Sequence, residues 1–324
     1  MVRNKLSALR VAGLFCLCLL AGIVQAAGEL AKPVRIGVLA YRGAEQAARE
    51  WQAHADYLTA KLPAYAFRIV PLDYKALDEA VAHRSIELLI TNTGHYTELE
   101  ATGQISRIAT RLVAGPDGPL NRFGGTAIAL ASRNDLAHYR DLKGQRLLIP
   151  EKSSLGGWQV HVREALAQGT QLEKAVASLR ETHNHERVVA GVLAGEADAG
   201  FVRSDLIESM IAQGKLSAGV LNVISPRTTP GYPYLHSTRL YPEWPFARVG
   251  DFPEDITKAV LIALLDMKPD DAAARQAHIH GWTLPQNYQP VLDLFREARF
   301  GPYARHDITW DDLVARHSVS LLGT

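Results

Sequence analysis

The stretch Val34-Arg35-Ile36-Gly37-Val38-Leu39 begins the pattern from which the fold can be predicted. Its apolar run is typical of a buried strand. Residues 44–62 follow with apolar side chains at spacings of three and four, the period of one helical face, and residues 66–72 form a second strand-like run. A short helix at 74–83 and a third strand at 85–91 continue the alternation. This order predicts a parallel sheet with right-handed crossovers, and therefore an α/β fold.

The alternation resumes in the second half of the chain, after a strand expected at residues 123–132. The further elements expected are a strand at 146–150, helices at 160–167 and 188–193, a turn and strand at 195–202, a helix at 205–213, a strand at 220–224, and late helices at 256–265 and 291–299. About 300 residues follow the leader described below, which is more than one hydrophobic core usually supports. We therefore expect two lobes: a first lobe from residues 34–122 and 226–324, and a second lobe from residues 123–225.

Residues 1–26 are typical of an export signal peptide. Three basic residues stand before an apolar run at 11–24, and Val24-Gln25-Ala26 offers the small-x-small pattern read by signal peptidase. The apolar run is shorter than the roughly twenty residues of a membrane-spanning helix, so a retained anchor is the less favoured alternative. We expect an exported, soluble, periplasmic product.

Cysteine content, charge and missing motifs exclude several classes of protein. The two cysteines, Cys16 and Cys18, lie inside the expected signal, so the mature chain has no disulfide or cysteine metal site. The full chain has 35 Lys and Arg against 34 Asp and Glu, a balance that argues against a nucleic-acid-binding protein. The sequence lacks the nucleophile elbow, the zinc-protease helix and the P-loop. We therefore expect a protein that is not an enzyme and needs no cofactor, with a periplasmic hydrolase or lyase as the least favoured alternative.

The element Ser153-Ser154-Leu155-Gly156-Gly157 is the strongest candidate for binding chemistry. It follows the strand expected at 146–150 and precedes the helix expected at 160–167. The first N–H groups of a helix have no partner within it, the helix dipole is positive there, and glycine permits close approach to the backbone. Ser153, Ser154, Gly156 and Gly157 are therefore predicted to seat an anion. The alternative is an ordinary capping turn, in which a serine only satisfies the helix.

Candidate ligand contacts also follow the strands of the first lobe. In an open parallel sheet, ligands bind beyond the carboxyl ends of the strands. Tyr41, Arg42, Thr93 and Tyr96 lie in loops at those positions. A tyrosine can offer a hydroxyl and a flat apolar face, and Arg42 a guanidinium for an oxyanion. The alternatives are hinge packing for the tyrosines and a solvated surface position for Arg42.

These features together resemble the type II periplasmic solute-binding proteins, and more narrowly their phosphate, phosphite and phosphonate branch. Three segments carry the resemblance: TNTGHY at 91–96, SSLGG at 153–157 and HERVVAGVLAGEADAG at 185–200. Residues 236–247, 281–285, 288–291 and 301–303 resemble the periplasmic sensor region of tetrathionate-type sensor histidine kinases. Leu155 departs from the phosphonate pattern, because a hydroxyl residue is expected there. A sulfur oxyanion or an organic anion therefore stays as open as a phosphonate.

The resemblance implies a two-lobed fold with a ligand cleft between the lobes, and a histidine near the ligand, which is His183 or His185. Arg203 follows the strand before the next helix and is a further candidate, with a lobe-stabilising ion pair as its alternative. The His-x-His spacing also suggests metal, but the sequence does not supply the three or four ligands that a metal site needs. We expect a free-standing, monomeric binding protein that presents a small anion to an ABC permease, or alternatively signals to a membrane sensor kinase.

Overall fold

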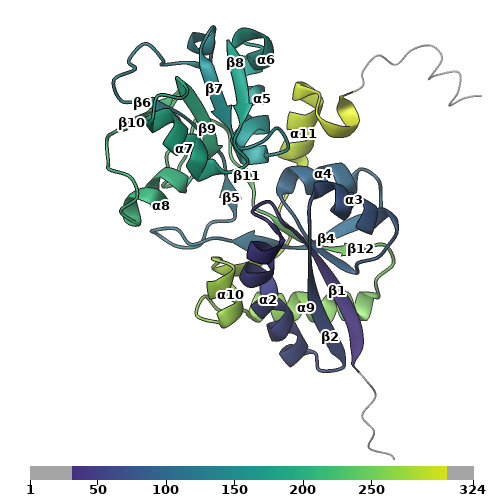
Figure 1. Ribbon diagram of the computed structural model, residues 1–324. Helices are drawn as coiled ribbons and strands as arrows, with labels where there is room; N and C mark the ends of the chain where they lie inside the picture. The colour runs from purple at the N-terminus through teal and green to yellow at the C-terminus, as the bar shows by residue number, and fades with distance from the viewer. Residues whose placement is uncertain (1–30, 305–324) are drawn as a thin grey trace, which may run out of the picture.

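The computed structural model describes residues 31–304, and the expected signal peptide therefore lies outside the described residues (Figure 1). Two separate sheets with their helices make up two lobes, which Figure 1 shows one above the other. Within residues 31–304, no helix combines the length and apolar character needed to cross a membrane.

The first lobe is built on a six-stranded sheet with the order β13-β4-β12-β3-β1-β2. Its strands are β1 (Lys32–Leu39), β2 (Tyr65–Leu72), β3 (Leu88–Ile90), β4 (Ile105–Leu112), β12 (Pro245–Val249) and β13 (Gly281–Thr283). As predicted, β1 pairs in parallel with both β2 and β3. The late strand β12 inserts antiparallel between β3 and β4, so a distant part of the chain completes this lobe.

Helices cover both faces of the first sheet. One face carries α2 (Ala44–Lys61), α9 (Glu254–Asp266) and α10 (Ala272–Gln276), and the other carries α3 (Tyr74–Ala82) and α4 (Thr93–Glu100). The face of α2 is set by the predicted spacing, since Ala47, Trp51, Ala55 and Leu58 are buried. This arrangement places the loop between β1 and α2 at the carboxyl end of a central strand.

The second lobe is built on a five-stranded sheet with the order β10-β6-β9-β7-β8. Its strands are β6 (Gly125–Leu130), β7 (Arg146–Ile149), β8 (Ser178–Glu181), β9 (Ala199–Arg203) and β10 (Leu221–Ile224). Its helices include α5 (Val160–Ala167), α6 (Leu172–Ala175), α7 (His185–Leu193) and α8 (Leu206–Ala212), with a 3-10 turn at Tyr139–Leu142. The strand expected at 123–132 is divided in two, because Gly124 breaks the ladder and donates its N–H to the Ser204 hydroxyl at 2.8 Å.

Two antiparallel segments and one helix join the lobes. The strand β5 (Arg122–Phe123) pairs with β11 (Tyr241–Pro242) where the chain crosses between the sheets. The helix α11 (Gln289–Ala298) packs on α5 of the second lobe and also on α4 of the first, as its place between the lobes in Figure 1 shows. Arg163 of α5 binds Glu297 of α11 at 2.6 Å. The lobe boundaries expected at 122/123 and 225/226 stay predictions.

Candidate functional site

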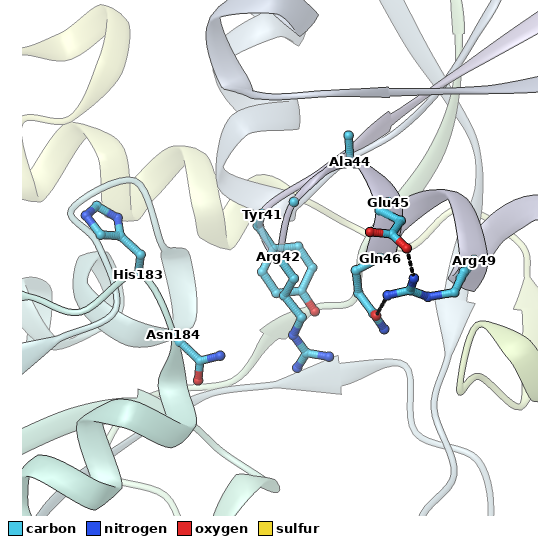
Figure 2. Close-up of a pocket in the computed structure, with 9 residues that line it drawn as sticks. Tyr41, Arg42, Ala44, Glu45, Gln46, Arg49, His183 and Asn184 are labelled. Carbon is cyan, nitrogen blue, oxygen red and sulfur yellow. Dashed lines mark hydrogen bonds and ion pairs between the residues drawn. The ribbon is translucent and has the colours of Figure 1, made fainter.

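A cavity of about 650 Å³ lies between the two lobes (Figure 2). The first lobe lines it with the loop after β1 and the start of α2, and the second lobe with the loop before α7. Its lining residues are Tyr41, Arg42, Gly43, Ala44, Glu45, Gln46, Arg49, His183 and Asn184. Three of the predicted site residues, Tyr41, Arg42 and His183, are therefore brought together at one cavity.

The first-lobe wall contains the start of an eighteen-residue helix. Gly43 precedes α2 with a φ of 94°, a conformation that favours glycine, and having no side chain it leaves the first N–H groups of α2 without a side-chain cap. Free N–H groups and the positive end of the helix dipole favour an anion at this point. Arg49 is held along the same turn by Glu45 and by Gln46, whose side-chain oxygen it meets at 2.8 Å (Figure 2).

Tyr41 and Arg42 present polar groups to the cavity. The Tyr41 ring meets Trp244 edge-on at 5.5 Å, and the Arg42 guanidinium lies 5.1 Å from the centre of the Tyr41 ring. Burial raises the pKa of the Tyr41 hydroxyl, and the charge of Arg42 acts in the opposite direction. Among residues 31–304 this hydroxyl has no hydrogen-bond partner, so it is free to bind a ligand. Arg42 faces Glu50 at 3.5 Å and is 43% exposed, a loose pairing that solvent screens.

The second-lobe wall is the loop before α7. His183 has a φ of 57°, and its N–H donates to the Pro150 carbonyl at 2.7 Å. In the view of Figure 2 its imidazole points away from Tyr41 and Arg42. Asn184 caps α7, since its side-chain oxygen accepts from the Glu186 N–H at 2.7 Å. The backbone of this loop is therefore fixed by hydrogen bonds, while the His183 imidazole is exposed.

His185 lies behind this wall. Burial lowers its pKa to about 3, and the charges of Arg203 and Arg42 add to the effect, so the ring is neutral at physiological pH. Its Nδ1 accepts the Arg203 backbone N–H at 3.1 Å. The proton of the neutral ring is therefore on Nε2, which can act as a hydrogen-bond donor.

Arg203 is paired inside the protein, as the alternative prediction for this residue had it. Its guanidinium contacts the carboxylates of Glu243 and Asp205, and Glu243 also binds Arg111 at 2.7 Å. Arg111 belongs to β4 of the first lobe and Arg203 to β9 of the second, so Glu243 links the two lobes. The two arginines lower the pKa of the buried Glu243 carboxyl to about 2 against the opposing effect of its burial.

The structure does not place the serine and glycine element at the cavity. Ser154 acts as a helix cap, and its hydroxyl accepts the Gly157 N–H at 3.1 Å. The glycines serve packing, since a Cβ on Gly157 would lie 2.2 Å from the Pro150 ring and one on Gly156 would lie 3.0 Å from Phe123. Ser153 lies beside the interlobe contact of Tyr74 and Glu151. Ser154 therefore caps this element as the alternative expected, and an anion seat here stays a prediction.

Thr93 and Tyr96 also lie away from the cavity. The Thr93 hydroxyl is buried and donates to the Pro242 carbonyl at 2.9 Å. The Tyr96 ring is buried in the core of the first lobe, where its hydroxyl donates to Glu100 at 2.6 Å. Both lie on α4 after a first-lobe strand as expected, but the helix turns their side chains into the protein.

Several residues of the cavity were not predicted. The start of α2 at 44–46, Arg49 and Asn184 all line it. One signal was present: a Tyr-Arg-Gly turn directly before a long amphipathic helix indicates a helix start without a capping side chain. Within residues 31–304, no group of three or more His, Cys, Asp and Glu side chains is arranged to hold a metal ion.

A family model and a curated relative match most of this chain. The family model described as "ABC transporter, phosphonate, periplasmic substrate-binding protein" matches residues 36–289. The tetrathionate sensor histidine kinase TtrS of Salmonella typhimurium is 26% identical over 303 residues, which are 93% of this chain and 48% of that protein. The chain therefore spans about half the length of this curated relative. Both resemblances found in the sequence are confirmed.

Solved structures of binding proteins share the fold. PhnD1 from Prochlorococcus marinus in complex with methylphosphonate has a TM-score of 0.66 and 15% identity, with 83% of this chain and 98% of that chain covered. A binding protein component of an ABC phosphonate transporter from Pseudomonas aeruginosa has a TM-score of 0.64 and 12% identity, with 89% and 94% covered. The aliphatic sulphonate binding protein SsuA from Escherichia coli has a TM-score of 0.52 and 16% identity, with 84% and 94% covered. The two-lobed α/β fold is that of type II periplasmic binding proteins.

Proposed function

The chain belongs to the family of periplasmic substrate-binding proteins of phosphonate ABC transporters, and from this premise we propose that it captures a small anion in the cavity between its lobes. The single observation that carries the proposal is that both lobes line this cavity. Arg42, the uncapped start of α2 and the Tyr41 hydroxyl come from the first lobe, and His183 comes from the second.

Ligand contacts from two lobes supply a mechanism of recognition. A ligand held by both lobes binds the closed form better than the open form, and that difference in affinity shifts the equilibrium towards closure. The closed form is then the one that an ABC permease distinguishes. In this mechanism no bond is made or broken, and the protein is not an enzyme.

The chemistry of the cavity favours an oxyanion. Guanidinium, hydroxyl and helix N–H groups are all donors that match the oxygens of phosphonate, phosphite or a sulfur oxyanion. PhnD1 is known in complex with methylphosphonate and TtrS is a tetrathionate sensor kinase, so both chemical classes belong in the test. Behind the wall, the neutral His185 ring can offer its Nε2–H as a donor, whereas the charge of Arg203 is balanced by the Glu243 and Asp205 carboxylates.

A second candidate function is the input of a two-component system. The similarity to TtrS over 303 residues favours it, since that protein is a sensor kinase of about twice the matched length. In this case the closed form engages a membrane sensor kinase instead of a permease. Affinity capture with a purified, vesicle-embedded kinase and permease distinguishes the two functions. Retention of the ligand-loaded protein by the permease supports transport, and retention by the kinase supports signalling.

The test of the binding function is calorimetry of the exported protein with phosphate, phosphite, methylphosphonate, sulfate, thiosulfate, tetrathionate and acetate. Wild-type protein is expected to bind at least one oxyanion. Arg42→Gln is expected to weaken that binding about tenfold or more, because a hydrogen bond to a charged group contributes about 1.5–3 kcal/mol. Arg84→Gln is the matched control, since Arg84 is an exposed arginine paired with Asp251 outside the cavity lining.

Three results would contradict this proposal. The first is a wild-type protein that binds none of these anions. The second is equal affinity in the Arg42→Gln variant and in the control. The third is chemical conversion of a bound compound by the purified protein, which would indicate an enzyme.

A further inference from the structure

Trp244 is the aromatic side chain that contacts the cavity residue Tyr41 from inside the first lobe. The two ring centres are 5.5 Å apart and the ring planes meet at 67°, which is an edge-on contact. This geometry is favourable for aromatic pairs, and it restrains the direction of both rings. Trp244 is not itself among the residues that line the cavity, so its ring reaches the cavity through Tyr41.

Tyr41 depends on this contact for its orientation. It belongs to the turn between β1 and α2, and within residues 31–304 its hydroxyl has no hydrogen bond that could hold the ring. In the same part of the chain, the other ring or cation contact of Tyr41 is the guanidinium of Arg42. Arg42 is exposed and loosely paired with Glu50, so it does little to fix the ring.

Trp244 is fixed through both its backbone and its ring. Its N–H donates to the Glu243 carboxylate at 3.2 Å, and its carbonyl accepts the Arg111 N–H at 2.9 Å. The Arg111 guanidinium lies 4.8 Å from the centre of the indole ring and binds the buried Glu243 at 2.7 Å. Glu243 in turn contacts Arg203 of the second lobe. The support of the Tyr41 ring is therefore held by the same residues that link the lobes.

We propose that Trp244 is a positioning residue for anion binding, because its ring holds Tyr41 in the orientation in which the hydroxyl meets the ligand. This inference rests on the proposed function and adds a residue outside the cavity to the determinants of affinity. A hydroxyl that is in place when the anion arrives loses less conformational entropy on binding than one that has still to be ordered. The ion pair between the lobes contributes to this preorganisation by fixing Trp244.

The experiment compares Trp244→Leu and Trp244→Phe with wild-type protein by calorimetry, with methylphosphonate, inorganic phosphate and thiosulfate as the probes. Trp244→Leu keeps an apolar side chain but removes the ring. We expect it to bind the probes about fivefold more weakly, since an edge-on aromatic pair contributes a factor of about two to ten to an equilibrium constant. Trp244→Phe retains a ring and is expected to restore most of the affinity.

Tyr65→Leu is the matched control for loss of a ring. Tyr65 is a partly buried aromatic residue of the first lobe that packs beside Phe67. It begins β2 and pairs with Lys32 at the start of β1, whereas the cavity lies beyond the other end of β1. Tyr65→Leu is therefore expected to bind the probes as wild-type protein does.

A double-mutant cycle with Tyr41→Phe tests whether Trp244 acts through the Tyr41 hydroxyl. Tyr41→Phe keeps the ring and removes only the hydroxyl. In that background Trp244→Leu is expected to cost no further affinity, because the group that Trp244 positions is gone. A purely structural role of Trp244 would lower affinity equally in both backgrounds, and that result overturns the inference. So does an affinity of Trp244→Leu equal to that of the Tyr65→Leu control.

A crystal structure of ligand-free Trp244→Leu judges the positioning even where wild-type protein binds none of the probes. We expect the Tyr41 ring to leave its place or to adopt two orientations in this variant, and to stay in place in Trp244→Phe. A Tyr41 ring that keeps the wild-type orientation in Trp244→Leu overturns the inference. The proposed function is judged separately, by wild-type protein and Arg42→Gln.

Discussion

Two buried histidines make the stability of this protein sensitive to mild acid. His54 of the first lobe and His161 of the second are both 0% exposed. Burial lowers the pKa of each to about 3, so both rings are neutral in the folded protein at physiological pH. His54 accepts the Trp282 indole N–H at 3.3 Å, and His161 pairs its Nδ1 with the Tyr139 hydroxyl at 2.8 Å. Within residues 31–304, the remaining nitrogen of each ring has no hydrogen-bond partner.

The sign of the effect follows from proton linkage. In the unfolded chain a histidine titrates near 6.5, so below that pH the unfolded state binds protons that the folded state does not. Stability from each ring is complete above pH 6.5 and is lost as the pH falls towards 3. Between pH 7 and pH 5 each histidine removes about 2 kcal/mol, and the two together about 4 kcal/mol. This is a large share of the roughly 5–15 kcal/mol by which domains are usually stable.

Carboxyl groups act against this loss in the same range. Burial raises the pKa of Glu98 and of Glu208, so the folded protein takes up protons there before the unfolded chain does. The difference between wild type and a histidine variant is therefore the decisive quantity, because the carboxyl contribution is common to both.

The assay is guanidinium chloride unfolding at pH 7, 6 and 5, followed by fluorescence. His54→Phe removes one buried titrating ring from an aromatic environment that includes Trp51 and Trp282. We expect its loss of unfolding free energy between pH 7 and pH 5 to be about 2 kcal/mol smaller than that of wild type. His83→Gln, at an exposed position, is the matched control and should follow wild type. An unchanged pH dependence in His54→Phe would refute the linkage argument.

Three further outcomes follow from the structure. Asp198→Asn should cost about 2 kcal/mol of unfolding free energy at pH 7, because hydrogen bonds from Arg146 lower the pKa of Asp198 to about 2. The stability difference between wild type and variant should shrink as the pH falls from 3.8 towards 2, and a constant difference would contradict this. Gly157→Ala should lower the melting temperature through a cost of about 1–3 kcal/mol, because the new Cβ would lie 2.2 Å from Pro150, and an unchanged melting temperature would show that the loop can yield. Tyr74→Phe removes the hydroxyl that donates to the carboxylate of Glu151 in the second lobe at 3.3 Å. The variant should have a larger radius of gyration in small-angle scattering without ligand, and no increase would mean that this contact does not hold the lobes together.

The fold was predictable where the signal is local. The helix expected at 160–167 is α5 with the same limits, and the parallel pairing of β1 with β2 and β3 follows from the strand–helix alternation. The strands β4, β12 and β13 were not predicted. Polar Arg107, Thr110 and Arg111 interrupt the apolar run of β4, and Pro245 begins β12. These strands are stabilised by partners far away in the chain, and no local pattern encodes that pairing.

The site was predictable to the extent that strand ends determine it. Tyr41 and Arg42 reach the cavity because they follow β1, which pairs in parallel with β2 and β3, and ligands bind beyond the carboxyl ends of such strands. The glycines at 156–157 show the limit of this reasoning. The sequence does not distinguish a glycine that leaves space for a ligand from one that leaves space for a neighbouring side chain. Here Gly157 packs against Pro150 and Gly156 against Phe123.

Arginines set a similar limit, because a sequence shows a charge and not its partner. Arg42 and Arg203 are both basic residues at strand ends, yet one meets a carboxylate at 3.5 Å near solvent and the other contacts the buried Glu243, forty residues further along the chain. The free energy available to an incoming anion depends on what each guanidinium gives up. Arg42 has only a solvent-screened contact of little value to give up, whereas Arg203 is already paired with the carboxylates of Glu243 and Asp205. The carboxylate partner of each arginine therefore decides how available its guanidinium is, and that partner cannot be read from the sequence.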